Sequence, residues 1–184
     1  MNTRREAAMT EYPTELDECI TLANDQRVHI RALRPCEDGS IREFYARLSA
    51  RTRYLRFFSP MPSLPDSVMR MLTCADYGRC LALVAEHVTS SGREIIGLGS
   101  YNAIDDQHAE VALVVRDDWQ RQRVGTTLAD RVLQAAERRG FHRFTALVHS
   151  DNRAIRRLLR NIGDVVSATI DGTLSELVFV RRHS

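Results

Sequence analysis

A glutamate, a short apolar strand and a polar turn before a helix form the part of this chain with the clearest chemistry. Residues 109–128 read AEVALVVRDDWQRQRVGTTL. The unpaired backbone N–H groups and the dipole at a helix N-terminus favour an anion such as a phosphate. Glu110 stands at the upstream end of the strand, and a carboxylate near a cleft can accept a proton from a bound group. This one segment therefore predicts a site for a phosphorylated cofactor and a general base beside it.

Length, composition and charge place the chain among ordinary globular proteins. Its 184 residues suffice for one domain with a substantial core. The content of 43% hydrophobic and 27% charged residues is typical, and the net charge of +2 argues against a nucleic-acid partner. No apolar run approaches the ~18 residues of a membrane span, and the N-terminus lacks the apolar core of a signal peptide. We therefore expect a cytoplasmic protein without a membrane partner.

The cysteine and histidine spacings do not indicate a metal site. The four cysteines and six histidines are scattered, without a C-x-x-C or H-E-x-x-H pattern. We expect reduced thiols and no bound metal. The basic residues are unusual in kind, because all 26 are arginine and the chain contains no lysine.

Apolar periodicity and turn residues predict strands and helices in the order ββα-α-βββ-αβ-αββ. Alternating residues indicate strands such as 94–103, and apolar residues at helical spacing indicate helices such as 125–138. Between the first two helices, the segment from Ser49 to Leu64 is aromatic, rich in arginine and interrupted by prolines, which end helices. The order fits an α/β (α+β) fold with a mixed, mostly antiparallel sheet and helices on both faces. We assign this single domain to residues 26–184 and an N-terminal extension to residues 1–25.

Four separated segments resemble one branch of the GNAT superfamily, the Pat-type bacterial protein lysine acetyltransferases. They are RTRYLRFFSPM (51–61), DYGRCLALVAE (76–86), AEVALVVRDDWQ (109–120) and NRAIRRLLRNIG (152–163). Their order is the one expected for the family, so the resemblance spans roughly residues 28–180. It implies a GNAT-like domain, acetyl-CoA as co-substrate, N-acetylation as the reaction and lysine side chains of proteins as acceptors. Acyl-CoA synthetases of the acetate-activating kind are the first protein targets that it suggests.

The same resemblance implies roles for individual residues. Glu110 matches the position of the family's catalytic glutamate and is the expected general base. Backbone groups of its strand would hold the pantetheine arm, because this strand splays from its neighbour in GNAT folds, and the following turn would bind the pyrophosphate. The expected cofactor-binding residues are Leu113, Val114, Val115, Gln120, Arg121, Gln122, Arg123, Val124, Gly125, Thr126 and Asn152.

Two arginines and a leucine depart from the family pattern. Glycines usually stand where this chain has Arg121 and Arg123, since the backbone there must approach a phosphate closely. Either the arginines point outward or pair with a phosphate, which suits a guanidinium, or the turn is distorted and the cofactor is weakly held or lost. Leu159 stands where many GNAT enzymes have a tyrosine that protonates the leaving thiolate, so the sequence shows no obvious general acid.

Several alternatives remain open at this stage. His108 is a second candidate for the base. Trp119 either packs in the core or forms a ligand platform. The arginines of 153–160 form either a solvated face or a binding site for the 3′-phosphate of CoA or for an acidic protein surface. The acceptor could instead be a small amine or a peptide N-terminus, or the domain could bind acyl-CoA without catalysis. No pattern predicts the oligomeric state. A lysine acetyltransferase of this sequence could not modify its own side chains, because it has no lysine.

Overall fold

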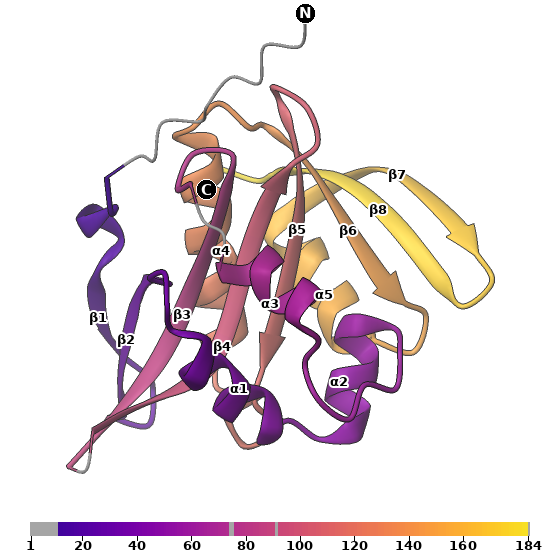
Figure 1. Ribbon diagram of the computed structural model, residues 1–184. Coiled ribbons are helices and arrows are strands. Elements are labelled where there is room, and N and C mark those ends of the chain that lie inside the picture. The colour runs from indigo at the N-terminus through magenta and orange to yellow at the C-terminus, as the bar shows by residue number, and fades with distance from the viewer. Residues whose placement is uncertain (1–10, 74–75, 91, 184) are drawn as a thin grey trace, which may run out of the picture.

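The fold is built on one mixed sheet (Figure 1). A computed structural model describes residues 11–73, 76–90 and 92–183. This part of the chain forms an eight-stranded sheet in the order β1-β2-β3-β4-β5-β6-β8-β7. Neighbouring strands are antiparallel except β5 and β6, which are parallel. The predicted fold class, a single α/β domain with a mostly antiparallel sheet, is confirmed.

The elements have the following bounds. The strands are β1 (Glu18–Thr21), β2 (Arg27–Ala32), β3 (Cys80–Thr89), β4 (Gly92–Ala103), β5 (His108–Val115), β6 (Arg143–His149), β7 (Gly163–Asp171) and β8 (Leu174–Arg181). The α-helices are α1 (Asp38–Ala46), α2 (Ala50–Phe57), α3 (Asp66–Thr73), α4 (Val124–Glu137) and α5 (Arg153–Ile162), and two short 3-10 helices are η1 (Thr14–Leu16) and η2 (Asp117–Trp119).

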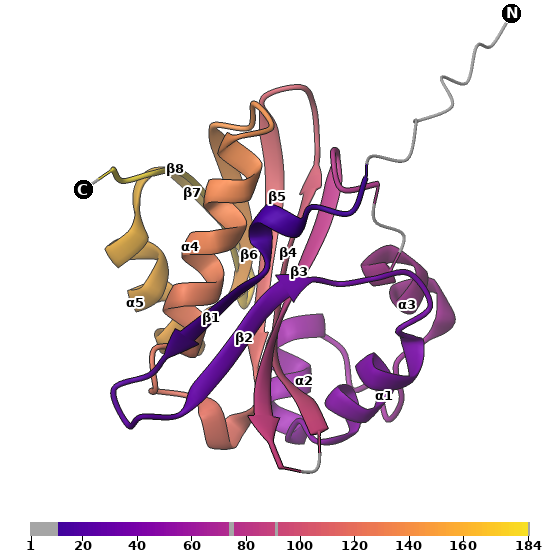
Figure 2. The same ribbon diagram turned by 90° about the vertical axis from the view of Figure 1, so that its left-hand side faces the viewer.

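Helices cover both faces of the sheet, as Figure 2 shows for α4 and α5 on one side and α1, α2 and α3 on the other. The alternation of side chains along a strand supplies both cores. In β3, Leu81 and Leu83 belong to the cluster that includes α4, whereas Ala82 and Val84 belong to the cluster that includes α1 and α3. Strands that are buried on both faces explain why β3 reads as a nearly continuous apolar run.

The parallel pair β5 and β6 separates after a short contact. Their register pairs only His108 with Arg143, Ala109 with Phe144 and Glu110 with Thr145. On its other edge β6 pairs with β8 from Phe144 to His149, and Figure 1 shows β5 and β6 diverging toward their carboxyl ends. From residue 111 onward, the described β5 therefore has no strand partner on its β6 side. Backbone groups on such an edge need other partners.

Two elements differ from the sequence expectation. Helix α2 lies within the segment where prolines argued against a helix: Ser49 caps its first turn by accepting a hydrogen bond from the Thr52 N–H (3.1 Å), and it ends at Phe58, before Pro60. Strand β1 and the buried Leu16 lie upstream of residue 26 and join the sheet and core. Residues 1–10 of the expected extension lie outside the described residues. In the described part of the chain, no helix is both long and apolar enough to cross a membrane.

Candidate active site

The divergence of β5 and β6 opens a cavity that passes between them. Its empty volume is about 680 Å³, part of it open to solvent. Helix α2 borders it on one face of the sheet, and α4 and α5 border it on the other. The lining comprises Leu55, Arg56, Phe58, Glu110, Val111, Ala112, Leu113, Ala129, Val132, Leu133, Ala146, Leu147, Val148, Asn152, Ile155, Leu158, Leu159, Ile162 and Phe179.

Glu110 lies at the fork of the two strands. It is the last residue of β5 that pairs with β6, opposite Thr145, and on its other side it pairs with Asn102 of β4. Its exposed side chain lines the cavity. Among the described lining residues only Arg56, Glu110 and Asn152 have polar side chains, so Glu110 is the one carboxylate there. A group at this position can accept a proton from a ligand in the cavity.

The other residues expected on β5 have different surroundings. Leu113 lines the cavity, whereas the Val114 side chain is buried on the opposite face, in the cluster that includes α1 and α3. Val115 belongs to the core beneath α4. The side chains of Val114 and Val115 therefore do not line the cavity, and any contact of these two residues with a cofactor would have to come from the unpaired backbone edge.

The turn between β5 and α4 has the backbone conformation that glycine favours, although arginine occupies it. Arg121 has φ 61° and Arg123 has φ 68°, both in the left-handed region. Side chains brace the turn: Gln120 donates to the Val115 carbonyl (3.0 Å), and Gln122 donates to the Asp118 carbonyl (2.8 Å). The turn is thus formed despite the two guanidinium groups. Both arginine side chains are exposed and make no hydrogen bond or ion pair with other described residues.

Helix α4 begins directly after this turn. Val124 is buried, Thr126 is exposed, and Gly125 packs between them against β5 and α5. A Cβ at Gly125 would lie 3.4 Å from Val115 Cγ2 and 3.6 Å from Leu158 Cδ1, which is ordinary contact. The helix therefore brings its first turn close to the diverging strand. Its N-terminal N–H groups, like those of the turn, are suited to an anionic ligand.

Asp117 ties this region to α2. Its carboxylate accepts hydrogen bonds from the Ser49 N–H (2.9 Å), the Ser49 hydroxyl (2.7 Å) and the Thr52 hydroxyl (2.7 Å). Burial raises the pKa of Asp117, but these hydrogen bonds outweigh it and hold the pKa below its ordinary value. Asp117 thereby anchors the start of α2 to η2, immediately before the turn that begins at Gln120.

Arg56 is a site residue that the sequence reasoning did not single out. It lies near the end of α2 and lines the same cavity as Glu110. Burial lowers the pKa of Arg56 to about 10, against the attraction of the Glu110 carboxylate, which raises it. The guanidinium remains protonated at neutral pH. The segment RTRYLRFFSPM was a signal for this region, but its spacing did not indicate which arginine faces inward.

Asn152, which was expected to bind the cofactor, also has a structural role. Its Oδ1 accepts a hydrogen bond from the Ile155 N–H (3.2 Å), which caps α5. It also lines the cavity, so a contact with a ligand is sterically available. Leu159, which stands in place of the family's tyrosine, is buried and lines the cavity as well.

Two further candidates are engaged elsewhere. His108 Nε2 lies 2.6 Å from the Thr145 hydroxyl, and His108 is not among the cavity-lining residues. Trp119 is 5% exposed and its ring centroid lies 4.6 Å from that of His87, so it packs against β3 as a core residue. Among the described acidic groups, Glu110 is therefore the base candidate that faces the cavity.

Diverging parallel strands and a turn suited to an anion at the start of a helix are the features of an acyl-CoA-dependent transferase. Comparisons with known proteins agree with this class. The model of the acetyltransferase (GNAT) family matches residues 43–163. The chain is 30% identical to Acetyltransferase PA5475 of Pseudomonas aeruginosa over 147 residues. This aligned region covers 79% of this chain and 78% of that protein.

Solved structures share the fold. The GNAT domain of S. lividans PAT superposes with a TM-score of 0.83 at 24% identity, over 92% of this chain and 99% of that domain. The putative acetyltransferase yncA from Salmonella typhimurium, solved with acetyl-CoA, has a TM-score of 0.63 at 17% identity, over 83% of this chain and 91% of that one. The chain belongs to the acetyltransferase (GNAT) family and is an N-acetyltransferase.

Proposed function

We propose that the chain transfers an acetyl group from acetyl-CoA to lysine side chains of proteins, with Glu110 as the general base. The observation that carries this proposal is the position of Glu110 at the fork of β5 and β6, as the one carboxylate among the described cavity-lining residues. The choice of lysine rests on the resemblance of four segments to Pat-type enzymes. Acyl-CoA synthetases are accordingly the first protein acceptors to test.

The cavity and the turn fit acetyl-CoA in their chemistry. The apolar walls and the unpaired edge of β5 suit an extended arm with amide groups, and the turn from Gln120 to Arg123 with the start of α4 suits a diphosphate. Bound acetyl-CoA supplies a thioester, whose carbonyl carbon is open to attack by a neutral amine. The side chains of Arg121 and Arg123 are exposed beside this turn and have no partner among the described residues, and a guanidinium pairs well with phosphate oxygens.

Glu110 would make the acceptor nucleophilic. A lysine ammonium has a reference pKa of ~10.4 and carries no lone pair, so it must lose a proton before it can attack. The Glu110 carboxylate can accept that proton directly or through one water molecule. The protein needs no tyrosine for the other half of the reaction, because CoA can leave as a thiolate near neutral pH.

A Glu110→Gln variant tests this assignment. It keeps the shape of the side chain and removes the base, so turnover should fall by about 10²- to 10⁴-fold while acetyl-CoA still binds. Turnover is followed by CoA release and by mass spectrometry of the acceptor, and binding by calorimetry. Any acetyl-lysine detected must belong to the acceptor, because the chain has no lysine.

Glu176→Gln is the matched control for this variant. Glu176 is exposed on β8 and does not line the cavity, so its substitution should leave turnover unchanged. Equal turnover of wild type and Glu110→Gln would remove Glu110 as the base. Tight acetyl-CoA binding with no acetylation of any lysine acceptor would contradict the proposed reaction.

A further inference from the structure

Arg56 is a cation in the cavity whose hydrogen-bonding groups are not satisfied within the described part of the chain. Its guanidinium makes no hydrogen bond or ion pair there. Its Cζ lies over the ring of Phe57, 4.9 Å from the ring centroid. Glu110 attracts it without forming an ion pair. Arg56 is partly exposed and none of its nitrogen atoms is among the buried unpaired ones, so its five donors are accessible from the cavity. A ligand that enters the cavity can pair with these donors by displacing water.

The surroundings of Arg56 favour an anionic partner. Helix α2 contains three arginines and α5 contains four, at positions 51, 53, 56, 153, 156, 157 and 160. Neither helix contains an acidic residue, and both border the cavity. These two helices therefore add only positive charge beside the cavity, whose described lining contains one carboxylate, Glu110. Charges of one sign along a cleft raise the local concentration of the opposite charge.

The phosphates of acetyl-CoA have other cations available. The turn that suits the diphosphate carries Arg121 and Arg123, and it adjoins the beginning of α2, where Gln120 lies 3.4 Å from the Thr52 hydroxyl. Arg56 is one helical turn farther along α2, beside Glu110 on the cavity wall. It thus shares the cavity with the proposed proton acceptor, whereas Arg121 and Arg123 lie in the turn that suits the diphosphate.

We propose that Arg56 selects acceptors that carry a carboxylate next to the reacting amine, which in a protein means a lysine with Asp or Glu as its sequence neighbour. The proposal rests on the proposed function, because it describes the acceptor of the same site. A lone ammonium approaching Glu110 is repelled by Arg56, whereas a neighbouring carboxylate pairs with the guanidinium through two parallel hydrogen bonds. Arg56 is on this account a specificity-determining residue.

Peptide pairs test the preference. Each pair has one lysine in a Gly/Ser background, with Asp or Asn immediately before it, or Asp or Asn immediately after it. Wild type should acetylate at least one Asp peptide with kcat/KM about 10-fold higher than its Asn counterpart, the size expected for a charge-assisted hydrogen-bonded pair. Arg56→Gln should abolish this ratio by raising KM for the Asp peptide, with little change for the Asn peptide.

Two further variants separate recognition from a structural role. Arg56→Lys keeps the charge but not the bidentate geometry, so a reduced preference of about 3-fold should remain. Arg51→Gln removes an exposed charge from the same helix outside the cavity lining and should leave the ratio unchanged. Retained acetyl-CoA binding, measured by calorimetry, shows that each variant is folded.

The outcomes are distinct. Equal kcat/KM of wild type for the Asp and Asn peptides, with measurable acetylation of both, would overturn the role of Arg56 and leave the proposed function standing. A fall in kcat for both peptides in Arg56→Gln would also overturn it, because Arg56 would then act on Glu110 and not on the acceptor. Acetyl-CoA binding without acetylation of any lysine peptide or protein would overturn both the inference and the proposed function.

Discussion

Asp117 and Ser49 link the two halves of the site. Ser49 donates to the Asp117 carboxylate through both its backbone N–H (2.9 Å) and its hydroxyl (2.7 Å). Ser49 is also the N-cap of α2, and Asp117 belongs to η2, immediately before the turn that suits a diphosphate. The helix that carries Arg56 and the turn that carries Arg121 are therefore held together by one carboxylate.

We predict that Asp117→Ala lowers both the stability of the protein and its affinity for acetyl-CoA. The loss of hydrogen bonds to a charged but exposed acceptor should cost about 1–2 kcal/mol of stability, and the loosened turn should raise the Kd for acetyl-CoA several-fold. Urea denaturation and calorimetry measure the two effects. Asp106→Ala is the control, because Asp106 lies in an exposed turn with an ion pair to Arg79 and does not line the cavity. An unchanged Kd in Asp117→Ala would show that the link does not shape the turn.

The left-handed backbone at Arg123 gives a second prediction. A left-handed conformation costs a non-glycine residue about 1–2 kcal/mol, while glycine loses about 0.4–1 kcal/mol through the entropy of the unfolded chain. Arg123→Gly should therefore stabilise the fold by up to about 1 kcal/mol. Arg123→Ala keeps the strain and should change stability little.

The same two variants report on the guanidinium. If Arg123 pairs with a phosphate, both substitutions should weaken acetyl-CoA binding about 3- to 10-fold, the size of one charge-assisted hydrogen bond. Thermal unfolding and calorimetry with acetyl-CoA measure stability and Kd separately. Tighter binding in Arg123→Gly than in wild type would mean that the arginine obstructs the turn, as the sequence comparison with glycine-containing family members allowed.

The succession of strands and helices along the chain and the turn before α4 were predictable from sequence, because each depends on short segments with local patterns. The splayed strand was expected from the family resemblance, and the order of the strands in the sheet was not predicted. The position of Arg56 was not, since α2 has four polar residues among eight and no clear apolar stripe. Its orientation is fixed by long-range hydrogen bonds from Ser49 and Thr52 to Asp117, which lies 65–68 residues away in the chain. Apolar periodicity in a single sequence does not detect such contacts. The sequence therefore predicted the site residues on β5, in the following turn and at the start of α5, but not Arg56 on α2.

Gly163 gives a third prediction, which depends on close packing. A Cβ at Gly163 would lie 2.6 Å from Phe179 Cδ2 and 2.8 Å from the Val180 carbonyl oxygen. Because the second atom belongs to the backbone, it cannot move away by rotating a side chain. Gly163→Ala should therefore destabilise the protein by about 1–3 kcal/mol.

Gly39 is the matched control for that substitution. It is exposed in α1, and a Cβ there would have no neighbour within 4 Å. Gly39→Ala should stabilise the fold by about 0.5–1 kcal/mol, since alanine loses less backbone entropy in a helix. Urea denaturation of both variants measures the difference. Equal effects of the two substitutions would contradict the packing argument at Gly163.

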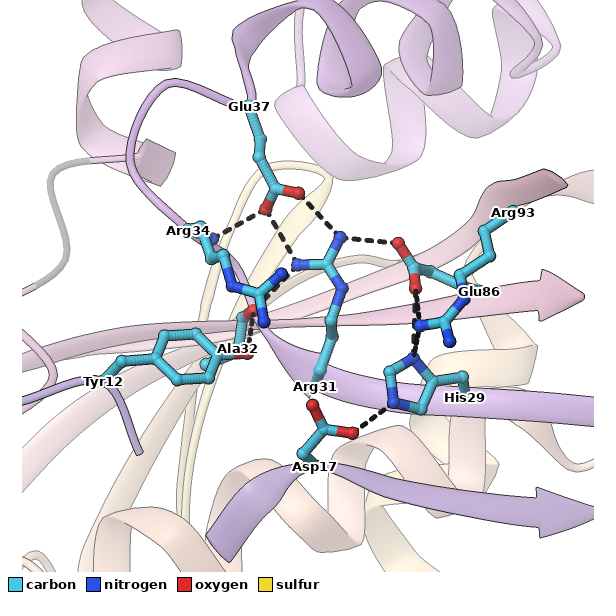
Figure 3. Close-up of polar contacts among 9 residues, drawn as sticks. All are labelled: Tyr12, Asp17, His29, Arg31, Ala32, Arg34, Glu37, Glu86 and Arg93. Atoms are coloured by element: carbon cyan, nitrogen blue, oxygen red, sulfur yellow. Dashed lines mark hydrogen bonds and ion pairs between the residues drawn. The ribbon is translucent and has the colours of Figure 1, made fainter. Parts of the chain in front are cut away.

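A largely buried ionic network lies at the end of the sheet formed by β1, β2 and β3 (Figure 3). Its members come from β2, β3 and the residues that precede β1 and α1. Arg31 NH2 lies 2.6 Å from Glu86 Oε1 and 2.7 Å from Glu37 Oε1. His29 lies between Glu86, at 3.2 Å from Nδ1, and Asp17. Burial raises the pKa of Glu86, but the hydrogen bonds from Arg31 and His29 outweigh it and hold the pKa below its ordinary value.

This lowered pKa gives the network a definite pH dependence. A carboxyl group whose folded-state pKa is depressed stabilises the fold above its unfolded-state pKa and loses that contribution as the pH falls through the folded-state pKa. Glu86→Gln removes the charge, while Arg31 keeps its pair with Glu37, so the substitution should cost about 1–3 kcal/mol at neutral pH. The difference between wild type and variant should shrink as the pH falls below the unfolded-state value of ~4.3. Urea denaturation across this range measures it, with the exposed Glu176→Gln as control; a difference that stays constant with pH would show that Glu86 does not carry the charge assigned to it.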